Sequence, residues 1–382
     1  MKDSSLRLCV VGSGTRFLSG ISYYTIRLAN ALADSNQVSA ILMRQLLPAR
    51  FYPGQNRVGA TLTSQKFVSK IKVFDGVDWY WLPSILGAIA LLLRERPDVI
   101  IFQWWTGTVL HTYLLLAWIA RLLNARIIVE FHEVLDTAEA RHRLVLAYVR
   151  SLMPWLIRAS SGFVIHSEFD RLALQKQYRL GDRPVSIIHH GPYDHYQFSG
   201  AQAPYREAPD GCCNLLYFGV IRPFKGLEDL IAAFDSIPPN EIEQYWLTII
   251  GETWESWTLP AELIAQSCYR KRITFINRYV SDQEAAVFFA SADAVVLPYH
   301  RSSASGPLHI AMSQGLPVII TNVGGLSEAV EDYAGAFLIP PQDSNALREE
   351  IKRVSKLRGR RFHNPRSWER NVQSYRSLFN TV

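Results

Sequence analysis

The chain has 382 residues, which favours two domains of about 100–200 residues each, and its 48% hydrophobic content excludes a disordered chain. Its formal net charge of +6 is unevenly spread: residues 1–200 carry 22 Lys and Arg against 14 Asp and Glu, whereas residues 201–382 carry 18 against 20. A basic first half suits an anionic partner or a merely basic surface. Because zinc-finger spacing, an RNP-type sequence and a helix-turn-helix pattern are all missing, nucleic acid is the least expected partner.

Short β-branched runs alternate with helical patterns through the first half. Two apolar stretches, 85–93 and 104–120, are predicted to be buried or interfacial helices, because the first is too short to span a membrane and the second contains His111. Near-continuous apolar strands separated by helices predict a parallel sheet covered on both faces. The predicted strands are 6–11, 38–43, 99–102, 125–131, 162–166 and 185–189, and the other predicted helices are 21–33 and 141–158.

A polar stretch rich in Gly, Pro and Ala then interrupts the alternation, so we place an interdomain linker at 195–212. Strand and helix patterns restart after it, which predicts a second parallel sheet. Its strands are expected at 214–218, 246–250, 273–276, 294–297, 317–321 and 336–339, and its helices at 227–234, 282–290, 308–314 and 345–354, followed by a separate amphipathic helix at 366–379.

The strongest chemical signal follows the first strand of the second half. Arg222 and Lys225 lie three residues apart there, and an Arg fork beside a Lys point charge suits a diphosphate, although the same pattern is typical of a solvated basic loop. Further on, Ser305 is predicted to be a helix N-cap, with Pro307 in the first turn. The positive end of that helix would then face a phosphate opposite the two basic side chains.

The first half offers weaker signals. Gly12 and Gly14, with Gly20 before the first helix, favour either an anion-binding loop or a tight strand–helix turn. His132 follows the strand 125–131, whereas His166, His189 and His190 are interpreted as structural. No cluster has metal-ligand spacing, so no essential metal is predicted, and the four cysteines are expected to be reduced thiols. The chain runs directly into a strand without a signal peptide, which predicts a cytoplasmic protein.

Taken together, these motifs resemble the retaining GT-B glycosyltransferases of the large group-one family. The resemblance covers nearly the whole chain and is specific in residues 215–330. It is carried by FGVIRPFKGLEDLIAAF, ITFINRYVSDQEAAVFFASADAVVLPY and SASGPLHIAMSQGLPVIITNVGGLSEAV, and more faintly by LSGISYYTIRLANAL, FHE and IIHHGPYD. It implies an α/β GT-B fold of two Rossmann-like domains facing across a cleft: an acceptor domain 1–194, a sugar-nucleotide domain 213–365, and a C-terminal helix 366–382 that packs back on the first domain.

The resemblance also implies roles for individual residues in binding a nucleoside diphosphate sugar. The donor diphosphate would be bound by Arg222, Lys225, Ser305, Gly306, Leu308 and His309, and the base or ribose by Asn277, Tyr279 and Val280. Glu328 occupies a further matching position, and Gly14 and Gly20 belong to the acceptor or phosphate loop. His132 would face the donor sugar and position it, with Glu133 and Glu130 as alternative carboxylates.

One departure from the family pattern affects the expected activity. Many members carry two glutamates eight positions apart that contact the sugar and the ribose, and this chain has Ser302 and Ile310 there. The expected function is transfer of a hexose, with retention, to a glycan or lipid-linked glycan, peripherally at the inner membrane face. A catalytically silent GT-B homologue that binds a partner, and a GT-B sugar-nucleotide epimerase, remain the alternatives.

Overall fold

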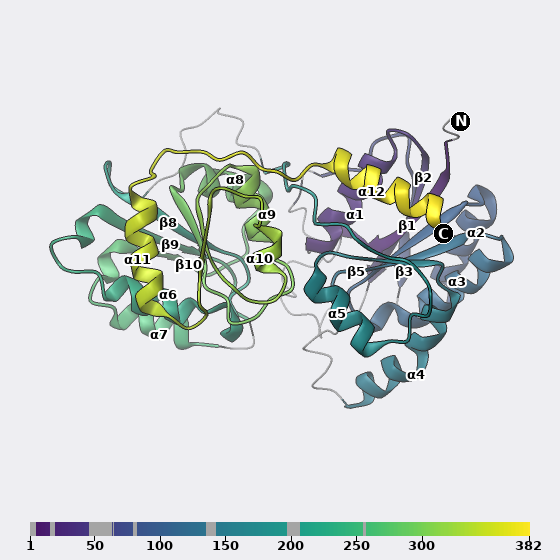
Figure 1. The fold of residues 1–382 in the computed structure, drawn as a ribbon, viewed down its shortest axis with the longest axis horizontal. Coiled ribbons are helices and arrows are strands. Elements are labelled where there is room, and N and C mark those ends of the chain that lie inside the picture. Colours follow the sequence, from purple (N-terminus) through teal and green to yellow (C-terminus); the bar gives the residue numbers. More distant parts are fainter. Residues whose placement is uncertain are drawn as a thin grey trace. The chain divides into compact units, whose positions relative to one another are not determined.

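The computed structural model describes residues 5–15, 20–45, 63, 65–78, 82–134, 143–196, 207–254 and 257–382, which form two compact units (Figure 1). Unit 1 consists of Met1–Thr61, Gln65–His190 and Trp368–Val382, and unit 2 of Leu62–Ser64 and Gly191–Ser367. The chain therefore leaves unit 1 after His190 and returns to it at Trp368. The predicted linker 195–212 falls within unit 2, and its residues 197–206 lie outside the described residues.

Unit 1 is built on a parallel sheet of seven strands in the order β3-β2-β1-β4-β5-β6-β7, a doubly wound arrangement in which the chain reverses direction between β1 and β4. The strands β1, β4 and β5 are almost entirely buried, as their apolar sequences require. The elements are β1 (Arg7–Ser13), α1 (Gly20–Leu32), β2 (Gln37–Gln45), β3 (Lys72–Asp78), α2 (Leu82–Glu95), β4 (Val99–Trp104), α3 (Leu110–Leu122), β5 (Arg126–Phe131), α4 (Arg143–Ala159), β6 (Gly162–Ile165), α5 (Glu168–Gln177) and β7 (Val185–Ile187), with a short 3₁₀ turn at Gly107–Val109.

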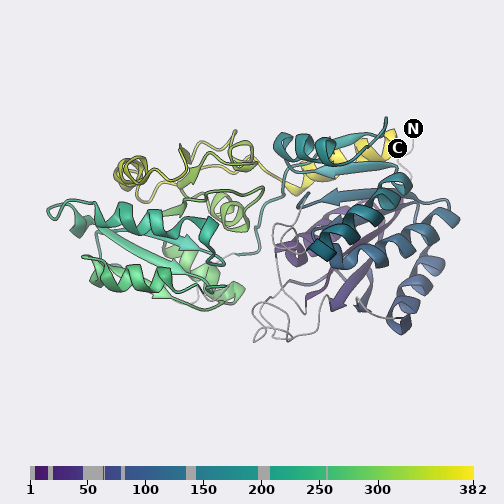
Figure 2. The same cartoon turned by 90° about the horizontal axis from the view of Figure 1, so that it is seen from below.

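Two hydrophobic layers enclose this sheet. On one face, alternate strand residues such as Cys9 and Val11 pack beneath α2, α3, α4 and α5. On the other face, Leu8 and Val10 pack beneath α1 and the C-terminal helix α12 (Trp368–Thr381). In both views the yellow α12 therefore lies in unit 1, far in sequence from the strands that it covers (Figures 1 and 2).

Unit 2 repeats the plan with six parallel strands in the order β10-β9-β8-β11-β12-β13. Helices α6, α7 and α11 cover one face, while α8 and α9 contact the strands from the other. The elements are β8 (Cys213–Phe218), α6 (Leu227–Asp235), β9 (Tyr245–Ile250), α7 (Leu259–Gln266), β10 (Ile273–Ile276), α8 (Asp282–Ser291), β11 (Ala294–Leu297), α9 (Gly306–Ser313), β12 (Val318–Thr321), α10 (Leu326–Ala329), β13 (Ala336–Ile339) and α11 (Ser344–Ser355), with 3₁₀ turns at Pro223–Lys225, Ile242–Gln244 and Arg270–Arg272.

All twelve predicted strands are present to within a few residues, but strand β3 and helices α5, α7 and α10 were not predicted, and one predicted helix has different bounds. The strand β3 was not predicted, because at the edge of the sheet it is mostly exposed and contains Gly and two Asp residues rather than an apolar run. The apolar stretch 104–120 is not one helix: Trp104 is the last residue of β4, and α3 begins only at Leu110. Among the described helices, none is long and apolar enough to cross a bilayer.

The return of the chain to unit 1 is held by polar contacts as well as by apolar packing. Asn371 of α12 donates from Nδ2 to the carbonyl of His189 at 2.9 Å, and Arg126 donates to the carbonyl of Phe379 at 2.5 Å. The hydroxyls of Tyr24 in α1 and Tyr375 in α12 lie 3.5 Å apart. Helix α12 is therefore part of the interior of unit 1 rather than a peripheral tail.

Candidate functional site

The predicted donor residues gather at one edge of the sheet in unit 2. All of its strands are parallel, so the loops that follow β8, β9, β10 and β11 emerge at the same edge. Strands β8 and β11 are neighbours whose following connections run in opposite directions, which is the switch point where open α/β sheets bind ligands. The two basic residues predicted from the sequence follow β8, and Ser305 follows β11.

Cationic side chains surround one aromatic ring at this switch point. The Arg222 guanidinium lies 5.6 Å from the ring centroid of Phe224, and Lys225 Nζ lies 5.5 Å from it. The guanidinium of Arg301, which follows β11, lies 4.7 Å from the same centroid. Lys225 Nζ also lies 3.7 Å from the centroid of Tyr299. Cations held over aromatic faces keep their charge and their N–H donors, so the three together can meet a diphosphate.

Sequence reasoning identified two of these cations and missed the third. Arg301 is exposed and stands four residues before the predicted N-cap, so its position after a buried strand was the available signal. Trp254 was also missed, and its ring centroid lies 4.9 Å from the Arg222 guanidinium.

Glycine is required where the loop after β8 enters α6. Gly226 has a φ of +64°, and a Cβ there would lie 1.9 Å from the carbonyl oxygen of Pro298, the residue after β11. Gly219, with a φ of +122°, would bring a Cβ to 3.2 Å from Pro307. The loops after β8 and β11 therefore pack backbone against backbone, which holds the cations of both loops in one place.

The start of α9 has the predicted capping geometry. Ser305 is the N-cap, and its side chain accepts a hydrogen bond from the Leu308 N–H at 3.4 Å, which confirms the predicted cap. A Cβ built on Gly306 would meet no atom within 4 Å, so the helix start faces open space there. Leu308 and His309 are buried, and the His309 ring stacks on Tyr193 at a centroid distance of 5.9 Å. The buried side chains of Leu308 and His309 therefore support the first turn of α9 from the interior.

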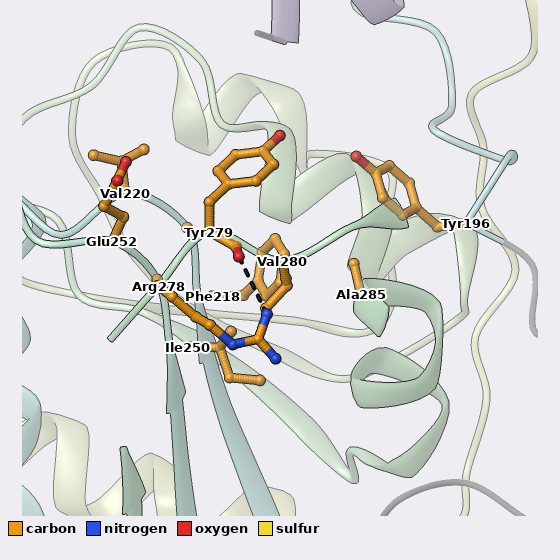
Figure 3. Close-up of a pocket in the computed structure, with 11 residues that line it drawn as sticks. Tyr196, Phe218, Val220, Ile250, Glu252, Arg278, Tyr279, Val280 and Ala285 are labelled. Atoms are coloured by element: carbon orange, nitrogen blue, oxygen red, sulfur yellow. Dashed lines mark hydrogen bonds between the residues drawn. The ribbon is translucent and has the colours of Figure 1, made fainter. Parts of the chain in front are cut away.

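A pocket lies beside the cations, at the ends of β8, β9 and β10 (Figure 3). Two predicted base or ribose residues, Tyr279 and Val280, line it. Figure 3 shows Arg278 directed across the pocket floor, where it donates to the Tyr279 carbonyl at 3.3 Å. The same guanidinium donates to Glu284 at 2.6 Å and, with Ser281, holds the pKa of that carboxyl down at about 2. The remaining lining residues are Tyr196, Phe218, Gly219, Val220, Ile250, Gly251, Glu252 and Ala285.

Two other residues singled out by the resemblance, Asn277 and Glu328, do not line this pocket. Asn277 does not line the pocket, and its Oδ1 accepts hydrogen bonds from the backbone N–H and the hydroxyl of Thr253 at 2.9 and 3.0 Å, so it fixes the loop after β9. Glu328 lies on α10, and its carbonyl accepts from Arg366 at 3.1 Å.

The positions of the two missing glutamates are occupied by groups that cannot replace them. Ser302 donates its hydroxyl to the carbonyl of Ala304 at 2.6 Å, and Ile310 is buried in α9. The carboxylates that meet this loop come from α6 instead: His300 Nε2 lies 2.6 Å from Asp229 Oδ2 and 4.0 Å from Glu228 Oε1.

In unit 1, the predicted glycine loop is tied to its own sheet. The Gly14 N–H donates to the carbonyl of Met43 at 3.0 Å, and a Cβ on Gly14 would lie 2.8 Å from an Asp75 oxygen. Ser22 donates its hydroxyl to the Gly14 carbonyl at 2.8 Å. Gly20 is the first residue of α1. Gly14 is therefore accounted for by its close packing against β2, β3 and the start of α1.

His132 and the neighbouring carboxylates lie at the carboxyl end of β5. The His132 imidazole is only 4% exposed, and its Nδ1 lies 3.1 Å from Nε2 of His166. Glu130 is fully buried, so it cannot reach a substrate, whereas Glu133 is exposed. Burial lowers the pKa of His132 well below its usual value and that of His166 to about 4, so both rings are neutral at physiological pH.

Comparisons with known proteins identify the families that this chain resembles. Residues 208–373 match the family model described as "Glycosyl transferases group 1", and residues 18–192 match "Glycosyltransferase Family 4". The glycogen synthase of Mycobacterium tuberculosis is 26% identical over 209 residues, which are 54% of this chain and 48% of that protein, so the chain spans about half the length of this relative.

Solved structures extend the likeness to the whole chain. Sucrose-phosphate synthase from Thermosynechococcus elongatus is similar with a TM-score of 0.68 at 18% identity, covering 99% of this chain and 100% of that one. HepE from Anabaena, solved in complex with UDP-glucose, has a TM-score of 0.64 at 16% identity, again covering 99% and 100%. At such identities the likeness shows the fold, and the predicted class of two Rossmann-like domains is confirmed.

Proposed function

Because the chain belongs to the group 1 glycosyl transferases, we propose that it transfers a hexose from a nucleoside diphosphate sugar to a glycan or lipid-linked glycan with retention of anomeric configuration. The observation that carries the proposal is the set of three cations at the switch point of unit 2, beside a capped helix start. A leaving nucleoside diphosphate develops negative charge, and preorganised cations and helix amides stabilise it. The UDP-glucose complex of the similar HepE supports a nucleotide sugar as the donor.

The residues of unit 2 divide the proposed donor between them. The pocket lined by Tyr279 and Val280 would take the base, since it combines aromatic and apolar walls with a few polar groups. Arg222, Lys225 and Arg301 would bind the diphosphate, and the open Gly306 at the start of α9 would lie under it. No step in this scheme needs a protein-bound metal.

Unit 1 would bind the acceptor and position the reacting sugar. Glu133 is the exposed carboxylate at the end of β5, next to the buried ring of His132. We assign His132 a positioning role, because its imidazole is anchored inside unit 1 and fixes the backbone from which Glu133 projects. Gly14 and Gly20 would belong to the loop that binds the acceptor or a phosphate.

Two alternatives differ in what the same site would do. A silent homologue is motivated by Ser302 and Ile310, which supply no carboxylate. The three cations at the switch point favour an active enzyme instead, because they are suited to stabilise a leaving diphosphate. A sugar-nucleotide epimerase needs several carboxylates for proton transfer. The two loops that carry the cations, 219–226 and 298–305, contain none, and the neighbouring Asp229 of α6 is paired with His300.

A donor panel separates the three functions. The purified chain is incubated with UDP-, GDP-, ADP- and TDP-sugars, with and without a lipid-linked glycan acceptor. Release of the free nucleoside diphosphate that depends on the acceptor and is lost in Arg222→Ala supports transfer. Interconversion of two nucleotide sugars would instead indicate an epimerase, and binding without any turnover a silent homologue. Lys271→Ala, a cation on an exposed turn before β10, is the matched control.

We further propose that the outer face of α2, α3 and α4 contacts an anionic membrane surface. Each helix exposes two large apolar side chains, and these are Leu86, Leu93, Trp118, Leu122, Leu144 and Trp155. The same three helices carry five arginines, Arg94, Arg121, Arg143, Arg150 and Arg158, against one glutamate, Glu95, which is paired with Lys72 and with Arg94. Apolar anchors among arginines suit an anionic lipid surface, where each cation contributes on the order of 1 kcal/mol.

Vesicle flotation tests this surface. We expect the chain to float with anionic vesicles, to bind neutral vesicles weakly, and to be released by high salt. Trp155→Ser and Arg150→Glu should each weaken binding, whereas Leu338→Ser, a similarly exposed apolar residue of unit 2, should not. Equal and poor flotation with both vesicle types would contradict the membrane contact and leave a freely diffusing acceptor.

A further inference from the structure

Three buried histidines meet at the carboxyl edge of the sheet in unit 1. They are far apart in the sequence and follow three different strands. Strands β5, β6 and β7 are parallel neighbours, so their carboxyl ends lie side by side. His132 directly follows β5, His166 directly follows β6, and His190 comes three residues after β7. All three are 4–7% exposed, and one ligand atom from each lies within 4.8 Å of the others.

The hydrogen bonds of His166 orient its ring toward this meeting point. Its Nδ1 lies 2.8 Å from the carbonyl of Ile188 and donates to it, which leaves the lone pair of the neutral ring on Nε2. That Nε2 lies 3.1 Å from Nδ1 of His132 and 3.8 Å from Oε1 of Glu130. A backbone carbonyl that fixes the tautomer is the usual outer support of a metal-bound histidine. Adjacent nitrogens on tetrahedral zinc are about 3.3 Å apart, close to the first of these distances.

The charge of the cluster also favours a cation. Glu130 is fully buried, and neither of its carboxylate oxygens has a hydrogen-bond partner among the described residues. Among the described residues, the basic side chain within ion-pair distance of this carboxylate is His166, whose Nε2 lies 3.8 Å from Oε1. A buried carboxylate is costly unless a charge compensates it, and a dication held by the three imidazoles would do so.

We propose that His132, His166 and His190, with Glu130 as the fourth ligand, bind one divalent transition-metal ion, with Zn²⁺ as the best fit. Imidazole and carboxylate are ligands that zinc accepts, and a buried site with four protein ligands is typical of structural zinc. The three nitrogens, which lie within 4.8 Å of one another, would need to approach by up to about 1.5 Å, and the Glu130 carboxylate would turn toward them to complete the tetrahedron. This inference does not depend on the proposed sugar transfer, and it reverses the prediction that no protein-bound metal is needed.

The position of the cluster indicates what the metal would stabilise. His190 is the last residue of unit 1 before the chain enters unit 2, and α12 packs over the cluster after the chain returns. The Tyr24 ring lies edge-on to all three histidines, at centroid distances of 4.7, 5.6 and 5.0 Å from His132, His166 and His190. A bound ion would therefore fasten the exit of the chain to the sheet beneath α12.

The test uses the full chain, stripped with a chelator and then dialysed against Zn²⁺. We expect about one zinc per chain by mass spectrometry of the metal content. At 100 times the dissociation constant, binding to the folded state should raise the Tm of unit 1 by about 5–10 °C. Co²⁺ in place of Zn²⁺ should give the visible absorption of a tetrahedral site. His190→Asn and Glu130→Gln should lose these properties, whereas His363→Ala, an exposed histidine of unit 2, should keep them.

The opposite outcome is equally definite. If wild type and His190→Asn retain the same trace of zinc, and Zn²⁺ leaves the Tm of the stripped wild type unchanged, the proposal is overturned and the cluster is a set of neutral rings sharing protons with Glu130. Because the zinc-dependent change in Tm is measured on wild type, the test stands even where a variant fails to fold.

Discussion

Both sheets of this chain are parallel and doubly wound, yet the ionisable side chains at their carboxyl edges differ in kind and in burial. In unit 2, the edge at the β8–β11 switch point carries Arg222, Lys225 and Arg301, whose cationic groups lie over the Phe224 ring, and it includes a helix start that faces open space at Gly306. In unit 1, the edge at β5–β7 carries histidines that are buried and neutral. Burial thus decides the chemistry: the first edge can stabilise a leaving diphosphate, and the second can fix the backbone or bind a cation.

The largest effect that would test this difference between the two edges is expected at His132. If the unit 1 edge only positions reacting groups, His132→Ala should bind nucleoside diphosphate nearly as wild type does but turn over at least about 100-fold more slowly, because positioning acts mostly in the transition state. Melting temperature, nucleotide affinity and turnover are measured on one preparation. His111→Ala, an exposed histidine on α3, is the control.

A purely structural His132 would give a different pattern. The Tm would fall and activity would decline only in proportion to the folded fraction. Near-normal turnover in a well-folded variant would remove His132 from the site and leave Glu133 as the group to examine.

The unit 2 edge should respond through affinity. Replacing Arg222 or Lys225 with Ala removes a charge-assisted hydrogen bond worth about 1.5–3 kcal/mol, so the Kd for the nucleoside diphosphate should rise about 10- to 100-fold. Folding should change little, because neither side chain is buried in the core. Calorimetry with the Lys271→Ala control measures the difference, and unchanged affinity in both variants would place the donor elsewhere.

How much of these two edges the sequence could predict depends on whether the signal is local. Arg222, Lys225 and the Ser305 cap were predictable, because each lies in a short loop between a clear strand and a clear helix. The histidine cluster was not, because His132, His166 and His190 are far apart in the chain and meet only through the order of β5, β6 and β7.

The same reasoning explains the remaining differences. Strand β3 was missed because an exposed edge strand lacks the apolar run that marks its buried neighbours. Asn277 was assigned to the base by resemblance, whereas its side chain holds Thr253, a contact that depends on the register of β9 beside β10.

Replacing Arg301 should change the Kd for the nucleoside diphosphate less than replacing Arg222 or Lys225. It is the most exposed of the three cations, so water screens its interaction with a phosphate more strongly. A hydrogen bond worth about 0.5–1.5 kcal/mol predicts a rise in Kd of about 2- to 10-fold for Arg301→Ala. Raising the salt concentration should shrink this difference. An effect as large as that of Arg222→Ala would mean that the bound ligand encloses the loop after β11.

The smallest effect on stability is expected at Glu284, which pairs with a cation of the pocket, Arg278, and so keeps it from a ligand. Arg278 lines the pocket, but it is paired with Glu284, whose carboxylate also accepts from Ser281 in the capping box of α8. The pKa of Glu284 is depressed to about 2, so its contribution to stability is complete above about pH 4.5 and is lost as the pH falls toward 2. Glu284→Gln should therefore remove part of the acid sensitivity in that window.

Solvent reduces the size of this effect, because the Glu284 side chain is 41% exposed. A glutamine can still cap the helix, so the loss at neutral pH should stay below about 1 kcal/mol. Thermal melts of both proteins at pH 7, 4 and 3 measure it. Parallel melting curves would show that the pair adds no pH-dependent stability. A tighter nucleoside diphosphate complex in Glu284→Gln would show that Arg278, once released, joins the cations of the edge.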